Sequence, residues 1–169
     1  MKLYTSYFYA VRFLSPNQIP LSTAVWDPKW FHNGMGQDHV FVDKRGVVNG
    51  LRAEKLHPGA GCAGLCRGLE SCACGDPSKC AFLRAYREQL AAVDKAAFIA
   101  SLSELGSRLK TRLGFGGEPE FVLMVHEPPY KECSERGALQ EAFGCGELDF
   151  GRKLRTGRRI IKTQGGKTA

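Results

Sequence analysis

A run of five apolar residues, Phe121–Val125, constrains the fold of this 169-residue chain more than any other segment. The run contains no polar residue, and Pro128 and Pro129 end the segment shortly after it. A strand without polar alternation is typical of an inner strand whose two faces are both covered, as in a parallel sheet. The run therefore predicts a buried strand in a central, partly parallel sheet.

Three helices are predicted beside this strand. Residues 79–91 carry apolar side chains at helical spacing. Asp94 is a favourable N-cap for a second helix with its own apolar stripe, which ends at the glycines that begin with Gly114. Ser134 is a favourable N-cap for a last helix over residues 135–143.

Further strands are predicted in the first part of the chain. Residues 2–9 and 19–26 are rich in β-branched and aromatic residues, which favour strands. The apolar residues of segment 40–48 flank a turn and predict a short hairpin or an irregular loop. Strands followed by two helices, a buried strand and a helix predict a single small α/β domain over residues 1–149, with helices flanking the sheet.

A cysteine-rich insert, residues 59–80, interrupts this pattern. Five of the seven cysteines fall within it, between glycines that let the backbone wrap a small ion. Zinc and iron–sulfur clusters need about four soft ligands that converge on one point. The insert has too few apolar residues to order itself, so a metal would supply the missing folding free energy. We predict a metal site, with zinc favoured over an iron–sulfur cluster, built from Cys62, Cys66, Cys72, Cys74 and Cys80.

Other interpretations of the insert stay open. Its spacing differs from the paired C-x2-C of zinc ribbons, so the thiols could be free and no metal bound, or they could form a redox sensor. Cys80 opens a predicted helix and could be a core residue. His57 lies close in sequence and could replace one thiol, although a surface histidine is the commoner outcome.

A second candidate site follows the buried strand. Ligands of open α/β sheets bind beyond the carboxyl ends of strands, often at a helix N-terminus. Cys133 directly precedes the last predicted helix, whose dipole would favour the reactive thiolate. Arg136 could bind a phosphate or carboxylate, and His126 and Glu127 could carry protons. These four residues predict a catalytic or binding site for a nucleotide or other anionic ligand.

Structural roles for the same residues also stay open. Cys133 could be a small buried residue or a further metal ligand, and Arg136 could pair with Glu132 or Glu141. His126 could serve only as a hydrogen-bonding group at the strand end. No complete catalytic triad is visible in the sequence, so whether the protein is an enzyme stays undecided.

The net charge of +7 is confined to the end of the chain. Seven basic residues and no acidic residue follow Asp149, so the remainder has as many basic as acidic residues. We expect a flexible tail over residues 150–169 that attracts nucleic acid by releasing counterions, or that only aids solubility. No aromatic residue lies among or after the basic residues of the tail, so base stacking by these residues is not expected. The predicted nucleic-acid contacts are Arg152, Lys153, Arg155, Arg158 and Arg159.

Composition limits where such a chain can work. With 43% hydrophobic residues, the chain can bury a core. It contains no run of about 18 apolar residues, so no membrane helix is expected. The first residues lack the pattern of a secretory signal. We therefore expect a cytoplasmic protein without a membrane partner, in a reducing compartment where disulfides are rare.

Several segments together resemble one protein family. They are Tyr4–Phe8, Lys55–Pro58, Tyr86–Leu90 with Asp94, and the strand Phe121–Val125 followed by Glu127, Pro128 and Cys133. In this order they resemble the bacterial and phage-type branch of the domain-of-unknown-function 488 family, over roughly residues 2–145 outside the insert. The resemblance implies an α/β fold with a central sheet and implies no settled activity. This chain departs from the family in two ways, because Ser134 and Glu135 stand where a His-Arg pair is typical, and because the insert is additional.

Overall fold

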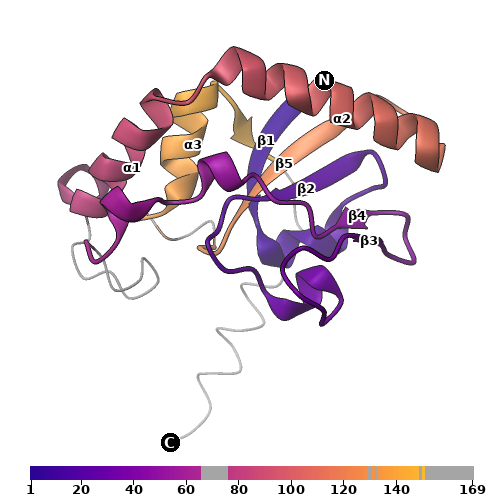
Figure 1. Ribbon diagram of the computed structural model, residues 1–169, viewed down its shortest axis with the longest axis horizontal. Coiled ribbons are helices and arrows are strands. Elements are labelled where there is room, and N and C mark those ends of the chain that lie inside the picture. Colours follow the sequence, from indigo (N-terminus) through magenta and orange to yellow (C-terminus); the bar gives the residue numbers. More distant parts are fainter. Residues whose placement is uncertain (66–75, 129–130, 132, 149, 151–169) are drawn as a thin grey trace, which may run out of the picture.

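Strand β5 (Glu120–Val125) is an inner strand of a four-stranded sheet with the order β2-β5-β1-β6 (Figure 1). Strands β1 (Lys2–Tyr7) and β2 (Gln18–Ser22) flank β5, and the short β6 (Gly146–Glu147) pairs with β1. All three pairings are parallel, which confirms the predicted α/β fold. The computed structural model describes residues 1–65, 76–128, 131, 133–148 and 150.

Both faces of β5 are buried, as its apolar run predicts. Phe121, Leu123 and Val125 enter one cluster of buried side chains, which we call the helix-side cluster. Val122 and Met124 enter a second cluster on the other face, which we call the opposite cluster. All five side chains are 0% exposed. Successive residues of a strand point to opposite faces, so only a strand covered on both sides can bury a continuous apolar run.

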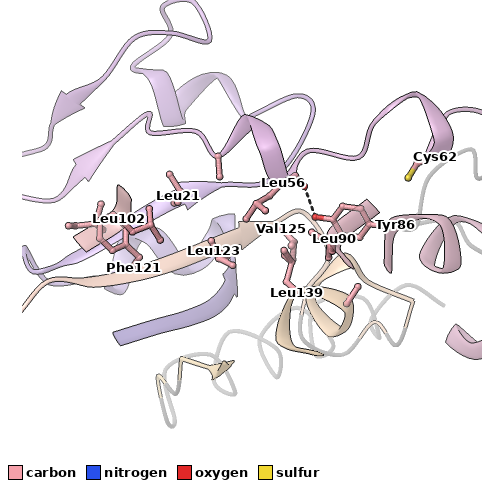
Figure 2. Close-up of a cluster of buried hydrophobic side chains, with 13 residues drawn as sticks. Leu21, Leu56, Cys62, Tyr86, Leu90, Leu102, Phe121, Leu123, Val125 and Leu139 are labelled. Carbon is pink, nitrogen blue, oxygen red and sulfur yellow. Dashed lines mark hydrogen bonds between the residues drawn. The ribbon is translucent and has the colours of Figure 1, made fainter. Parts of the chain in front are cut away.

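The three α-helices cover the helix-side face. They are α1 (Ala81–Ala91), α2 (Lys95–Leu113) and α3 (Glu135–Phe143). Figure 2 shows side chains of all three helices packed against β5, and the buried Tyr86 of α1 donates a hydrogen bond to the carbonyl oxygen of Leu56 at 2.6 Å. None of the helices in the described part of the chain combines the length and apolar character needed to cross a bilayer.

The helix ends lie where the capping residues predict them. The Asp94 side chain accepts a hydrogen bond from the Ala97 amide, and the Ser134 side chain accepts one from the Arg136 amide. These side chains satisfy amide groups that have no partner within the helix. Gly114 ends α2 in the left-handed conformation that glycine adopts without steric cost.

Among the described residues, no α-helix covers the opposite face. Two 3₁₀ segments, Phe8–Phe13 and Lys29–His32, pack there beside an antiparallel hairpin of β3 (Phe41–Val42) and β4 (Val48–Asn49). Of the two predictions for segment 40–48, the hairpin is therefore correct.

Two predicted strands are too long. The strand predicted over residues 2–9 ends at Tyr7, because Phe8 turns into the opposite cluster. The strand predicted over 19–26 ends at Ser22, where its hydroxyl donates to the Asp27 side chain and the chain turns away from the sheet. Aromatic and β-branched residues continue past both ends, so composition alone hides these turns.

Candidate functional site

The carboxyl ends of β1 and β5 lie side by side, because their parallel register runs from Lys2 beside Glu120 to Tyr7 beside Val125. After β1 the chain enters the opposite cluster, whereas after β5 it leads to α3 on the helix side. Adjacent strands whose connections diverge to opposite faces leave a crevice between them, and open α/β sheets bind ligands there. The predicted site loop, residues 126–136, starts at this point.

Glu127 and Arg136 come together just beyond the carboxyl end of β5. Glu127 is 5% exposed and Arg136 is 7% exposed. The Arg136 Nη1 donates to the Glu127 backbone oxygen at 3.2 Å, and the Ser134 hydroxyl donates to the Glu127 Oε2 at 3.2 Å. Glu127, Ser134 and Arg136 therefore form one buried polar unit, in which both predicted site residues hold defined positions.

Of the two alternative partners of Arg136, Glu141 does not pair with it. Glu141 instead accepts a hydrogen bond from the Arg87 Nε of α1 at 2.7 Å. The Arg136 Nε lies 3.9 Å from the Glu147 Oε2 of β6, a partner that spacing along a helix could not indicate. Glu132, the other expected partner, lies outside the described residues.

Glu135 adds an unusual carboxyl group to this unit. Burial and the nearby negative charge of Glu127 raise the pKa of Glu135 to about 8. A carboxyl group that holds its proton near neutral pH can donate it, so Glu135 has the property of a general acid. The sequence contained no signal for this role, because the burial that raises the pKa comes from the packing of α3.

The Tyr86 hydroxyl belongs to the same electrostatic neighbourhood. Burial is the main cause that raises the pKa of Tyr86, and the charges of Glu135, Cys62 and Glu127 raise it further. Tyr86 is fully buried and its hydroxyl is held by a backbone carbonyl, so it keeps its proton and acts as a structural donor.

His126 occupies an exposed position at the end of β5. Its Nε2 lies 2.6 Å from the backbone oxygen of Trp26, and its ring packs against Phe8 with 5.0 Å between ring centres. This arrangement favours the expected alternative, in which His126 ties the strand end to a neighbouring loop.

Two cysteines that are distant in the sequence meet in a small buried cluster. Cys80, at the end of the insert, and Cys133, before α3, pack with Leu83, and each cysteine is 6% exposed. Reactive cysteines are usually partly exposed, so the burial of Cys133 favours a packing or metal-binding role over a nucleophilic one. The structure thus links the end of the insert to the second candidate site.

Cys62 is buried in the helix-side cluster, with Tyr86 and Leu90 of α1. Its Sγ lies 3.8 Å from the Gln89 Oε1, and burial raises the pKa of the thiol. His57, the alternative metal ligand, lies with its Nδ1 3.4 Å from the Arg52 Nη2. The described cysteines are free thiols, namely Cys62, Cys80, Cys133 and Cys145.

Part of each prediction lies outside the described residues. This holds for three insert cysteines and for the basic positions of the tail. Within the ranges that the structure describes, no three or more His, Cys, Asp or Glu residues are grouped so as to hold a metal ion. The predicted positions outside these ranges are Cys66, Cys72, Cys74, Arg152, Lys153, Arg155, Arg158 and Arg159.

A buried polar network at the end of β2 was not predicted. The Asp27 carboxylate accepts a hydrogen bond from the Ser22 hydroxyl, and its Oδ2 lies 2.7 Å from the His32 Nε2 and 3.4 Å from the Arg52 Nε. The His32 Nδ1 lies 2.9 Å from the His39 backbone oxygen. The carboxylate stands between serine and histidine, so this histidine cannot take the serine proton as in a catalytic triad. We therefore assign the network to folding of the loop.

No protein-family model matches the chain, and no curated protein and no solved structure matches it. A function must therefore follow from the residues and geometry described above.

Proposed function

We propose that this chain is a nucleic-acid-binding protein in which the cysteine insert holds a structural zinc ion and the basic tail contacts the polyanion. Its resemblance to the domain-of-unknown-function 488 family is part of the same proposal. The observation that carries the nucleic-acid role is the separation of charge, because all of the excess positive charge follows Asp149. A dense basic arm attached to a neutral domain binds a polyanion by releasing its counterions.

The meeting of Cys80 and Cys133 supports the metal. Each zinc ion in a structural site takes four ligands, commonly thiolates. Two thiols that converge from different elements supply half of such a set, and the remaining insert cysteines offer more than enough for the other half. Cys133 would then serve as a ligand, and the metal would tie the insert to the start of α3.

Metal content after purification without chelator tests this part. We expect about one zinc per chain by elemental analysis, and its loss in the Cys133→Ser variant. Cys145→Ser is the matched control, because Cys145 is partly buried at the end of α3 and does not belong to the Cys80 cluster. Visible absorbance together with iron in the protein would show that the site holds an iron–sulfur cluster and not zinc. A fully folded protein without metal would contradict the metal site.

Binding to single-stranded and double-stranded oligonucleotides tests the nucleic-acid role. We expect affinity to fall steeply with salt, with a slope of about 0.7 for each neutralised phosphate of a single strand. A full-length variant with glutamine at all seven basic tail positions should bind far more weakly and with a shallower slope. This variant has the same length as the wild type, so any difference in binding comes from the lost positive charge. If the full-length protein does not bind polyanions at low salt, the nucleic-acid role is contradicted.

The adjacent carboxyl ends of β1 and β5 favour a second candidate function, the binding or conversion of a small anionic ligand. It rests on the diverging connections of the two strands and on the raised pKa of Glu135 beside Glu127 and Arg136. A nucleoside phosphate should raise the melting temperature of the wild type and do so less for Glu135→Gln. Glu141→Gln, on the outer side of the same helix, is the control. Failure of nucleoside mono-, di- and triphosphates at millimolar concentration would count against this candidate.

A further inference from the structure

A cavity of about 320 Å³ opens on the face opposite the three α-helices. It lies between the 3₁₀ segment Phe8–Phe13, Trp30 and the β3–β4 hairpin. Its volume is at the lower end of the range of about 300–1,000 Å³ that is usual for ligand pockets. The cavity therefore has room for one small planar group.

The walls of this cavity combine aromatic rings and guanidinium groups. Tyr9, Trp30 and Phe41 contribute aromatic rings, and Arg12 and Arg45 contribute guanidinium groups. Trp30 is 50% exposed, although its ring is packed edge-on against Phe31. The Arg12 guanidinium lies over the Tyr9 ring, 3.6 Å from its centre. Aromatic rings and guanidinium planes are the surfaces on which unstacked nucleic-acid bases lie.

The charges of the cavity favour a negatively charged occupant. The Arg45 guanidinium pairs with Asp43, and its Nη1 also donates to the Val11 backbone oxygen at 3.0 Å, which holds it in place. Arg12 forms no ion pair with any carboxylate in the described ranges and is exposed. The lining thus carries one more positive than negative charge, which suits a phosphate group.

The last described residue before the basic positions packs near one wall of this cavity. Phe150, the last described residue, packs against the opposite cluster, and its ring centre lies 5.9 Å from that of Phe13. Phe13 directly follows Arg12 in the 3₁₀ segment. Seven basic residues follow Phe150 in the sequence. The tail and the cavity carry the same sign of charge, so the tail is a poor occupant, whereas one polyanion can contact both.

We propose that this cavity is a stacking site for a base of a single-stranded nucleic acid. Trp30 and the Arg12–Tyr9 pair receive the base, and Arg12 contacts its phosphate. The domain thereby supplies the stacking that residues 151–169, which include no aromatic residue, cannot supply. The proposal rests on the nucleic-acid function proposed above, and it adds a preference for unpaired bases, because a base inside a duplex cannot enter the cavity.

Tryptophan fluorescence tests the site directly, because the chain has two tryptophans. In the full-length Trp26→Phe variant, Trp30 is the only remaining tryptophan, so the emission comes from Trp30. Titration with an oligodeoxythymidylate of about 12 nucleotides, within the usual site sizes of single-strand binders, should quench its emission to saturation. A duplex of equal length should bind more weakly and quench less.

Affinity measurements on zinc-loaded, full-length variants complete the test. Trp30→Leu should weaken single-strand binding about 5- to 100-fold, the range expected for one lost stacking contact, and leave the salt slope unchanged. Arg12→Gln should weaken binding and lower the slope by about 0.7. Trp26→Leu is the matched control, because Trp26 is 74% exposed and does not line the cavity. Circular dichroism confirms that each variant is folded.

The outcomes separate this proposal from the one on which it rests. If the wild type binds no oligonucleotide at low salt, both fail. If it binds, but Trp30 emission is unchanged and Trp30→Leu and Arg12→Gln bind like the wild type, the stacking site is wrong and the tail alone carries the function. Equal affinity for duplex and single strand, or tighter binding of thymidine monophosphate than of the strand, would also overturn the stacking site.

Discussion

Glu135 stands at the first position of α3, where its carboxyl group is partly shielded from water and faces the charge of Glu127. Its pKa is about 8 in the folded protein, against an ordinary value of 4.5. The folded state therefore holds this proton more tightly than the unfolded state does. Stability from this group is fully present below pH 4.5 and declines as the pH rises to about 8.

Glu135→Gln should remove this dependence. Glutamine carries no charge to bury, so we expect the variant to melt at a higher temperature than the wild type at pH 9. The difference should shrink toward zero near pH 4, where the wild-type carboxyl group is protonated in both states. Thermal unfolding followed by circular dichroism across this pH range measures the effect.

Glu141 supplies a control of opposite sign on the same helix. A hydrogen bond from Arg87 lowers the pKa of Glu141, so this group stabilises the fold above its ordinary pKa and loses that effect in acid. Glu141→Gln should therefore melt slightly below the wild type at pH 7 and converge with it in acid. Identical pH profiles for the two variants would contradict the environment assigned to Glu135.

Asp27 is the residue on which the buried polar network depends. Asp27→Ala would leave His32 and Arg52 without their carboxylate, and loss of one partner of a buried ion pair costs about 3–5 kcal/mol. We expect a loss of this size in the free energy of unfolding, measured in urea. The exposed Asp38 is the matched control, and Asp38→Ala should change stability by less than about 0.5 kcal/mol.

At the scale of elements, α2 meets β5 through a glycine. A Cβ atom added to Gly106 would lie 2.8 Å from the Pro119 Cβ and 3.2 Å from the Phe121 Cε2. Glycine weakens a helix interior by about 1 kcal/mol relative to alanine, so its presence has a packing reason here. It lets the helix approach the start of the central strand closely.

A pair of glycine substitutions tests this contact. Gly106→Ala should lower the free energy of unfolding, because crowding costs about 1–3 kcal/mol and the gain in helix propensity is about 1 kcal/mol. Gly137→Ala in α3 is the control, since an added Cβ there has no neighbour within 4 Å. It should stabilise the protein by about 0.5–1 kcal/mol. Stabilisation by both substitutions would show that α2 is not held this closely.

The whole molecule is organised around a strand that comes late in the chain. β1 and β2 do not pair with each other, and β5 lies between them. The clusters on both faces also depend on the side chains of β5. The first part of the chain therefore cannot complete either core before β5 is in place.

Truncation tests this dependence. A chain that ends at Gly114 keeps β1, β2, α1 and α2, yet we expect no cooperative thermal transition, because β5 is missing from both cores. A chain that ends at Phe150 keeps every described element and should retain the transition. Calorimetry distinguishes the two, and a cooperative transition in the shorter chain would contradict the central role of β5.

Much of this architecture could be predicted from the sequence, because its signals are local. The apolar run 121–125 required a strand covered on both faces, and Asp94 and Ser134 marked helix starts through hydrogen bonds that span a few residues. The strand ends after β1 and β2 could not be predicted in this way. They depend on the packing of Phe8 and on the bond between Ser22 and Asp27, which compositional strand signals do not contain.

By itself, the sequence determined the α/β class, the inner strand, the helix caps and the position of the excess charge, because periodicity, capping and charge are properties of neighbouring residues. Tertiary structure alone decided which distant groups meet. It placed Cys80 and Cys133 in one buried cluster, Glu135 near Glu127, and Trp30 at a cavity beside Arg12. Such meetings depend on strand order and on which face each connection crosses, and burial then sets their chemistry.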